Sequence, residues 1–432
     1  MDVEAKGGEA PIRPLLGWRR DSFWNENRLL EELERVFDIC HGCRRCLTLC
    51  SAFATLFELV DDSPSVGLEG VEKRDYWRVV EHCSLCDLCY ETRCPYIPPH
   101  ERQVDFPHLM LRAKAVRNRR RGGGTVGERL LALPDRMGRL ASIPMFGGMA
   151  CAMIDNPFSR RLLRIPAGAR LPACRRDTLR RRLSRRVGKP SLPVGRDSQG
   201  GVVLFSTCYG NYQYPEIGEH LVAILEHNTV PVVLAEEERC CGMLSLESGD
   251  LKGVEEAKRF NVPRLMEWIE KGWSILMLQP SCLQLFRRWL PALFPDDPQV
   301  DRVRNAVWDP VEYLLSRREV GRLKTDFQHS LGVVACHLPC HLKIDGSGAK
   351  IRDLLNLVPD TYVELVEGCM KRCGISSCHE TGRSPVAEKI CQIMPDHYGS
   401  SCMLAGARLE AEVANDSRVE HPLALLRMAY GI

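Results

Sequence analysis

The sequence predicts a multidomain α + α/β protein in which a helical N-terminal domain precedes two tandem α/β domains. Eight of the 21 cysteines lie in two tight runs between residues 40 and 94. From residue 201 onwards, short β-branched runs alternate with amphipathic segments, which is typical of βαβ units. The alternation occurs again after residue 330, and this recurrence indicates an internal duplication.

Length and composition restrict the class of protein. The 432 residues allow two to four domains, and 44% hydrophobic with 27% charged residues is an ordinary globular balance. Nowhere does the sequence approach the ~18 consecutive apolar residues of a membrane span, so we expect no integral membrane protein. Residues 1–6 lack the character of a secretory signal, which predicts a cytoplasmic location. Because the cytosol keeps thiols reduced, the cysteines are expected to be metal ligands.

The two cysteine runs have the spacing of iron–sulfur ligands. In such runs three cysteines wrap one cubane, while the fourth reaches the other cluster of a two-cluster protein. The spacing therefore predicts one [4Fe–4S] cluster on Cys40, Cys43, Cys46 and Cys94, and another on Cys83, Cys86, Cys89 and Cys50. The alternative is structural zinc, which typically uses two separated cysteine pairs.

The surroundings of both runs indicate helices. Apolar residues recur at helical intervals in 29–37, before the first run, and in 76–80, before the second. We therefore expect the helical type of ferredoxin domain rather than the small β-rich type. The runs depart from the usual pattern in two ways. One extra residue precedes Cys94, and Ser51 stands where a proline usually follows the last cysteine.

In the first α/β unit, cysteines follow the predicted strands. Strands are expected at 202–207, 230–234 and 274–278, and they lead to Cys208, the Cys240-Cys241-Gly242 triplet and Cys282. The carboxyl ends of parallel strands share one edge, so these thiols can converge there. Helices are expected from Pro215 and over 251–271, the latter interrupted at Pro263.

The second unit repeats this layout with changes. Strands are expected at 332–336 and 362–366, and helices at 351–357 and 386–393. Cys340, Cys369 and Cys402 follow Cys208, Cys240 and Cys282 at offsets of 132, 129 and 120 residues. Met370 stands where the second cysteine of the Cys-Cys pair would be.

These motifs resemble those of a known family. Besides the two four-cysteine runs, the matching motifs are Thr207-Cys208, Cys240-Cys241-Gly242, Pro280-Ser281-Cys282, His337-x-Pro-Cys340-His341 and Ser401-Cys402. The chain resembles the iron–sulfur subunits of anaerobic glycerol-3-phosphate dehydrogenase and glycolate oxidase, whose cysteine-rich CCG domains also occur in heterodisulfide reductase. It looks most like a branch of stand-alone bacterial Fe–S oxidoreductases, often encoded near rubrerythrin-like proteins. The resemblance covers nearly the whole chain except residues 110–200.

The resemblance implies a domain plan and a further cofactor. It divides the chain into a two-cluster ferredoxin-like domain (1–110), a basic helical linker (111–200), a first CCG domain (201–325) and a second, degenerate one (326–432). It also implies one additional iron–sulfur centre on Cys208, Cys240, Cys241 and Cys282, with Cys340, Cys369 and Cys402 as weaker counterparts. Either Cys373 substitutes in the second repeat, or that repeat has lost its metal.

The remaining cysteines and histidines have simpler interpretations. Cys336, Cys373, Cys378 and Cys391 are expected to be unligated thiols, and Cys151 and Cys174 to be bystanders. His337 and His341 flank Cys340 as ligands, donors to a ligand, or ordinary core histidines. A Cys340–His341 catalytic pair is the least favoured alternative, and no catalytic residue is assigned.

The sequence contains no nucleotide-binding fingerprint in a suitable context, so we expect no flavin or NAD on this chain. The leading hypothesis is an oxidoreductase subunit that passes electrons between a partner redox protein, flavoprotein or rubrerythrin-like, and an acceptor. One alternative is a disulfide reductase acting at the CCG centre. A further alternative is a redox or metal sensor with a basic arm for nucleic acid.

The basic segment at 160–189 contains twelve Lys and Arg residues and one acid, Asp177. A solvated helical face or tether is the simplest interpretation. Peripheral contact with the cytoplasmic face of a membrane is the next, because anionic lipid attracts basic segments. Nucleic-acid binding is the least favoured, since the arginines have no interleaved aromatic residues.

Overall fold

The computed structural model describes residues 13–123, 177–184, 201–235, 237–344, 347–368, 384–413 and 418–432, with the single residues 135, 138, 139, 142, 156 and 370. No helix within these ranges is long and apolar enough to cross a membrane.

The N-terminal domain is built from five α-helices over residues 13–123. They are α1 (Glu26–Cys43), α2 (Ser51–Asp61), α3 (Tyr76–His82), α4 (Leu88–Thr92) and α5 (Phe106–Arg120). Asn25 caps α1 by accepting a hydrogen bond from the Arg28 amide at 3.0 Å. Leu29, Leu33, Val36 and Phe37 are buried at helical spacing, so α1 packs through one apolar face. The predicted helical character of this domain is therefore confirmed.

The first α/β repeat contains a parallel sheet in the order β2-β1-β3-β4. Its strands are β1 (Val202–Phe205), β2 (Val232–Leu234), β3 (Ser274–Met277) and β4 (Val307–Trp308). Its helices are α11 (Cys208–Tyr212), α12 (Pro215–His227), α13 (Met243–Ser248), α14 (Leu251–Glu270), α15 (Pro280–Gln284), α16 (Leu290–Leu293), α17 (Pro298–Ala306) and α18 (Pro310–Glu319). All four residues of β1 are buried, as expected for a strand covered on both faces.

The second repeat has a parallel sheet of corresponding order, β6-β5-β7-β8. Its strands are β5 (Gly332–Leu338), β6 (Thr361–Glu367), β7 (His397–Ser400) and β8 (Val419–Glu420). Its helices are α19 (Cys340–Lys343), α20 (Ser347–Leu355), α21 (Pro385–Ile393), α22 (Met403–Glu410) and α23 (Pro422–Tyr430). The first strand of each repeat lies between the second and the third, which is the arrangement expected of a duplicated unit.

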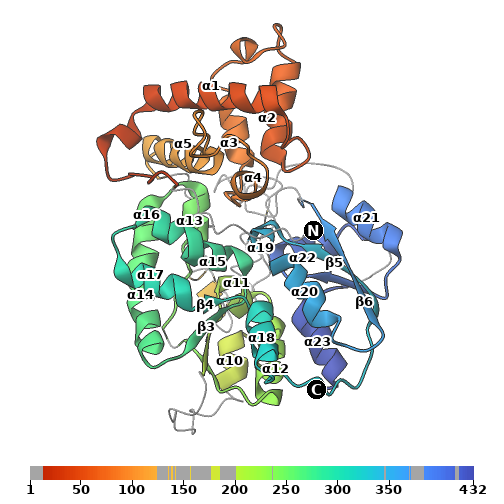
Figure 1. The fold of residues 1–432 in the computed structure, drawn as a ribbon. Helices are drawn as coiled ribbons and strands as arrows, with labels where there is room; N and C mark the ends of the chain where they lie inside the picture. The colour runs from red at the N-terminus through yellow and green to blue at the C-terminus, as the bar shows by residue number, and fades with distance from the viewer. Residues whose placement is uncertain are drawn as a thin grey trace, which may run out of the picture.

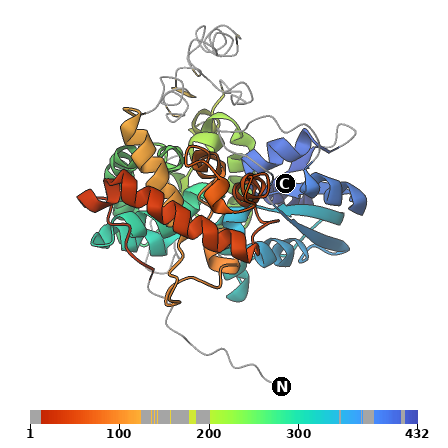
Figure 2. The same ribbon diagram turned by 90° about the horizontal axis from the view of Figure 1, so that it is seen from above.

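The three parts meet around a common centre. The two α/β repeats lie side by side, and the N-terminal helices lie across one end of both (Figures 1 and 2). Contacts of α5 with α13 join the N-terminal domain to the first repeat, and contacts of α4 with α19 join it to the second. The repeats contact each other through α12 with α23 and through α18 with α20. The carboxyl edge of the first sheet therefore faces the N-terminal domain.

Two helices differ from the expectations drawn from the sequence. The helix over 251–271 is not interrupted at Pro263, because α14 continues through it. Burial of Asn261, Val262, Leu265 and Met266 on both sides of the proline offsets the ~3 kcal/mol that an interior proline costs. The expected boundary at residue 110 falls inside α5, which packs on α1, α3 and α4 and so belongs with the N-terminal helices.

Most of the basic linker lies outside the described residues. Its described part includes α10 (Leu179–Ser184), which packs against α11 and α12 of the first repeat. Arg180 forms an ion pair with Glu238 at 3.1 Å, and Arg182 forms one with Glu219 at 2.8 Å. These two arginines therefore contribute to intramolecular packing.

Candidate metal centres

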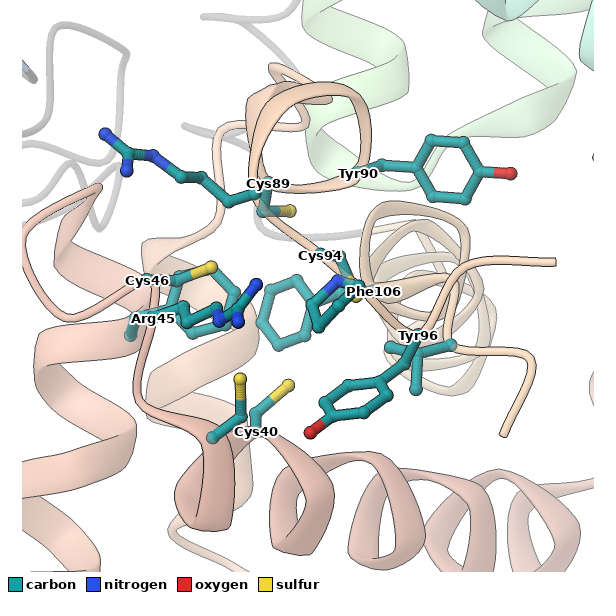
Figure 3. A pocket seen from close by; sticks show the side chains of 13 residues that line it. Cys40, Arg45, Cys46, Cys89, Tyr90, Cys94, Tyr96 and Phe106 are labelled. Atoms are coloured by element: carbon teal, nitrogen blue, oxygen red, sulfur yellow. The ribbon is translucent and has the colours of Figure 1, made fainter. Parts of the chain in front are cut away.

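The structure brings the first predicted thiol group together around one cavity. Cys40 and Cys43 lie in the last turn of α1, Cys46 follows in a turn, and Cys94 comes after α4. All four line a pocket whose wall includes the apolar side chains of Phe53, Val104 and Phe106 (Figure 3). Burial raises the pKa of Cys40 well above its usual value, and the neighbouring thiols Cys94, Cys46 and Cys43 raise it further. The fourth cysteine thus comes from the other run, as the spacing predicts.

The second predicted group likewise combines three cysteines of one run with one cysteine of the other. Cys50 directly precedes α2, Cys83 directly follows α3, Cys86 lies just before α4 and Cys89 lies in its first turn. The pKa of Cys89 is raised well above its usual value by burial, and then by Cys86, Cys83, Cys50 and Cys46. Cys89 also lines the cavity of the first group, so the two groups adjoin.

An arginine that forms ion pairs with two acidic side chains fixes the loop that carries the second cysteine run. Asp87 lies between Cys86 and α4, has a positive φ of 68°, and is almost fully buried. Arg13 donates to both of its oxygens, at 2.7 and 2.8 Å, and also to both oxygens of Asp105. The guanidinium lies 4.1 Å from the centre of the Tyr90 ring. This network, which gave no sequence signal, holds the second cysteine loop in one conformation.

The first repeat assembles the third thiol group at the edge of its sheet. Cys208 begins α11 after β1, Cys240 and Cys241 follow β2, and Cys282 lies in α15 after β3. The Sγ atoms of Cys241 and Cys282 are 3.1 Å apart, and those of Cys208 and Cys240 are 3.9 Å apart. Because β1 lies between β2 and β3, this group lies where the strand order reverses, the usual ligand position in an open parallel sheet.

Local backbone geometry places these thiols. Gly242 has a φ of 103°, and a Cβ atom there would lie 2.9 Å from the Ala257 Cβ, so the triplet requires its glycine. Thr207 has a φ of 63°, an uncommon value for a threonine, and its hydroxyl accepts a hydrogen bond from the Gly210 amide at 3.1 Å. Such strain directly before Cys208 is typical of a functional loop.

Two buried side chains that the sequence did not single out hold the Cys240–Cys241 loop. The Asn261 amide of α14 accepts a hydrogen bond from the Arg239 amide at 3.0 Å and donates to the carbonyls of Arg239 and Cys240. Glu238 accepts a hydrogen bond from the Ser206 amide at 2.8 Å. Neither residue belongs to a recognisable motif, because each acts on backbone groups that are distant in sequence.

The thiols of the first repeat are held in their protonated form by their surroundings. The hydrogen bond between Cys208 and Cys240 raises the pKa of Cys208 well above its usual value, and burial raises that pKa further. The hydrogen bond with Cys241 lowers the pKa of Cys282, but burial together with the neighbouring Cys208, Cys240 and Glu238 raises it, and the pKa is about 11. Metal binding to this group must therefore displace protons.

The described thiols of the second repeat have different neighbours. Cys340 opens α19, which packs against α4 of the N-terminal domain, and its Sγ lies 3.6 Å from His341 Nδ1. The proximity of Cys340 raises the pKa of Cys86. Cys402 precedes α22 and accepts a hydrogen bond from Gln279 Nε2 at 3.4 Å. Met370 is buried in the repeat's core, with its Sδ 3.7 Å from Ser384 Oγ. Cys369, together with Cys373 and Cys378, lies outside the described residues, as do Cys151 and Cys174.

The other singled-out residues of the second repeat are placed in its core. Cys336 is fully buried in β5, and Cys391 is half-buried in α21. His337 contacts Ser400 Oγ at 3.3 Å and the Gly368 carbonyl at 3.2 Å, and burial lowers its pKa to about 4. It is a neutral core histidine that bridges strands, whereas His341 lies beside Cys340.

Charged groups also lie between the thiol groups. Lys114 Nζ of α5 donates to the Glu247 carbonyl at 3.2 Å, and the lysine lowers the pKa of the nearby Cys83 against the larger effect of burial. Burial raises the pKa of the Glu247 carboxyl, while Lys114 and His341 lower it. A half-buried lysine and a half-buried glutamate therefore lie between the N-terminal domain and the first repeat.

The donor chemistry of the three groups fits iron–sulfur clusters. Thiolates are soft ligands, and each group offers four of them in a largely apolar environment. Among the described residues, no three His, Cys, Asp or Glu side chains converge on a single metal ion.

Comparison with known proteins confirms the resemblance to the CCG family. Residues 202–287 match the family model described as a cysteine-rich domain, CCG. Lactate utilization protein A 2 of Bacillus mycoides is 25% identical over 212 residues, which are 48% of this chain and 83% of that protein. Lactate utilization protein A of Halalkalibacterium halodurans is 24% identical over 192 residues, 44% and 76% of the two chains. No solved structure gives a significant match.

Proposed function

We propose that this chain is an electron-transfer subunit that connects a partner redox protein to an acceptor through two [4Fe–4S] clusters and one CCG-bound centre. The observation that carries the proposal is the meeting of three four-thiol groups, with the first two adjoining at Cys89. Iron–sulfur clusters, when bound, accept and release single electrons. Adjoining groups such as the first two suit stepwise electron transfer better than storage or sensing.

The protein side chains have two tasks in this proposal. The thiols hold the clusters, and apolar residues such as Phe53 and Phe106 keep water from the first group. Backbone clamps, among them Asn261 at Cys240 and Arg13 at Asp87, fix the loops so that the thiols do not move between redox states. Rigid sites keep the reorganisation that accompanies electron transfer small.

The relatives point to the class of electron donor. Their names associate them with lactate utilization. We propose that a flavoprotein dehydrogenase acting on a small 2-hydroxy acid supplies the electrons to this chain. In a mixture of the chain with such a dehydrogenase and lactate, the visible cluster absorbance should bleach, and it should stay unchanged when the dehydrogenase is left out. Bleaching by lactate alone would contradict a need for a partner.

Metal analysis tests the cluster content. The anaerobically purified chain should contain at least about eight iron atoms and equal sulfide from two ferredoxin clusters, plus the iron of the CCG centre. Substantial zinc with little iron would overturn the proposal.

A matched pair of variants tests the division into separate centres. Cys241→Ser should abolish the EPR signal of the CCG centre while the two ferredoxin signals persist, because Cys241 belongs to the third group alone. Cys391→Ser is the control, since this half-buried cysteine of α21 lies outside all three groups. Simultaneous loss of every signal in Cys241→Ser would show that the centres are not independent.

A further inference from the structure

The first thiol group is the least buried of the three. Its members are Cys40, Cys43, Cys46 and Cys94, and each of them is half-buried. In the second group Cys83 and Cys89 are buried, and in the third group all but Cys240 are buried. Because electrons pass between two proteins faster when their cofactors lie closer together, a partner protein gains most by docking over the first group.

Two exposed arginines lie at this group. Arg45 and Arg93 line the cavity around the four thiols, and Figure 3 shows Arg45 beside Cys46. Within the part of the chain that the structure describes, neither arginine forms an ion pair. Arg44, the third arginine of the two cysteine runs, pairs with Asp61 of α2 instead.

The acidic residues of the two cysteine runs already have basic partners. The first run, 40–50, contains no acidic residue, and the second contains Asp87 and Glu91. Asp87 accepts hydrogen bonds from Arg13 at 2.7 and 2.8 Å, and Glu91 forms an ion pair with Arg288. The exposed charge that these two runs present at the first group is therefore positive.

An exposed apolar side chain lies in the same turn. Leu47 directly follows Cys46 and is 49% exposed, and the exposed Pro95 lines the cavity from the second run. Apolar contacts flanked by charged residues are typical of interfaces between proteins that associate transiently. The surface around the first group thus combines apolar side chains with unpaired positive charge.

We propose that the surface formed by Arg45, Leu47, Arg93 and Pro95 is the docking surface for the partner redox protein, and that this partner presents an acidic patch to it. Opposite charges steer two proteins together and orient them, here with their cofactors close. This inference rests on the proposed function, because docking at the first group delivers electrons only if that group holds a cluster.

Binding of an acidic redox protein to the full-length, iron-loaded chain tests the proposal. The probe is flavodoxin, a small acidic flavoprotein, and surface plasmon resonance measures its association. The association rate constant should fall steeply as the salt concentration rises. Arg45→Glu and Arg93→Glu should each lower it several-fold at low salt, and both together should lower it at least about tenfold.

Two controls accompany these variants. Arg322→Glu, at an exposed position after α18, changes the net charge as much as either single variant but should leave flavodoxin binding nearly unchanged. Cytochrome c, a basic redox protein, should not bind to the unmodified chain. Iron and sulfide per chain should be the same in all variants, because the substituted side chains are exposed and are not thiols.

Three results would overturn the inference. The first is the absence of salt-sensitive flavodoxin binding, and the second is an equal loss of binding in Arg322→Glu, which would show that net charge alone acts. The third is binding of anionic lipid vesicles as strong as that of flavodoxin and lost in the same variants, which would assign the surface to a membrane. Iron analysis and EPR of the unmodified chain separate this from the proposed function. Absence of the two ferredoxin clusters would defeat the proposed function, whereas intact clusters without flavodoxin binding would defeat only this inference.

Discussion

The two α/β repeats share one strand order but use their cysteines differently. In the first repeat, loops after three neighbouring strands bring four thiols together, with two Sγ pairs at 3.1 and 3.9 Å. In the second, the helix that Cys340 opens packs against the N-terminal domain, Cys402 contacts Gln279, and Met370 is part of the core. Among the described residues, the shared sheet topology therefore preserves where the loops lie, whereas the contacts of their cysteines differ between the repeats.

Of the variants that test this difference between the repeats, Gly242→Ala should have the largest effect on stability and on the metal centre. Alanine at a φ of 103° and 2.9 Å from the Ala257 Cβ should cost about 1–3 kcal/mol of stability and abolish the EPR signal of the first repeat. Gly406→Ala in α22 of the second repeat is the control, because a Cβ there meets its nearest neighbour only at 3.6 Å. Thermal unfolding and EPR measure both effects, and retention of the signal in Gly242→Ala would contradict the requirement for glycine.

A second variant removes the clamp on the Cys240 loop. Asn261→Ala deletes three hydrogen bonds to the backbone of Arg239 and Cys240 and should cost about 1–3 kcal/mol. Because the loop is then released, the chain should also lose the iron of the first repeat.

The matched control for that variant is Asn228→Ala. Asn228 is equally buried and bonds the Lys324 amide at 2.8 Å, away from the cysteine edge. It should lower stability in urea unfolding without loss of iron. Equal iron loss in both variants would mean that general destabilisation, rather than the clamp, causes it.

Acid should weaken the second repeat through His421. Burial lowers the pKa of this histidine to about 3, so the folded chain binds fewer protons than the unfolded chain. The stability that neutral His421 contributes is complete above about pH 6.5 and is lost as the pH falls towards 3. Between pH 6.5 and 5 this amounts to about 2 kcal/mol, since one pKa unit corresponds to about 1.36 kcal/mol.

The variant His421→Asn isolates this contribution. Asparagine retains a helix-capping acceptor for the Leu423 amide but does not titrate, so the fall in Tm between pH 6.5 and 5 should be smaller than in the unmodified chain. His329→Asn, at an exposed position, should leave the pH dependence unchanged. An identical pH profile in all three proteins would exclude His421 as the cause.

The smallest change is expected when the missing cysteine is restored. Met370→Cys recreates the Cys-Cys pair in sequence, but position 370 faces the core beside Ser384, so iron per chain should not rise. Metal analysis of the loaded protein measures this. A gain of iron would mean that the second repeat retains a working metal site, and the contrast between the repeats would disappear.

Much of the architecture follows from local sequence patterns. The β-branched runs predicted β1, β2, β3, β5 and β6 but not the short strands β4, β7 and β8. The helical spacing before Cys40 and Cys83 predicted α1 and α3, and the strand ends predicted the meeting of Cys208, Cys241 and Cys282. These features depend on periodicity and on the shared edge of parallel strands. Which metals the thiols hold stays a prediction.

The contacts between domains could not be predicted in this way. The resemblance implied Cys340, Cys369 and Cys402 as weaker counterparts of the first site, but it gave no sign that α19, which begins at Cys340, packs against α4 of the N-terminal domain. Asn261, Gln279 and Lys114 likewise act across long sequence distances on backbone groups or on thiols. No local pattern records such partners, because the tertiary packing creates them.

The crossed origin of the first two thiol groups has a consequence for biogenesis. Cys94 completes the group of Cys40, and Cys50 completes the group of Cys83. A nascent chain that has left the ribosome only as far as the first run therefore offers three cysteines for one group and a single one for the other. Neither group is complete until Cys94 has emerged, so cofactor insertion must follow synthesis of both runs, and truncation between them leaves no complete group.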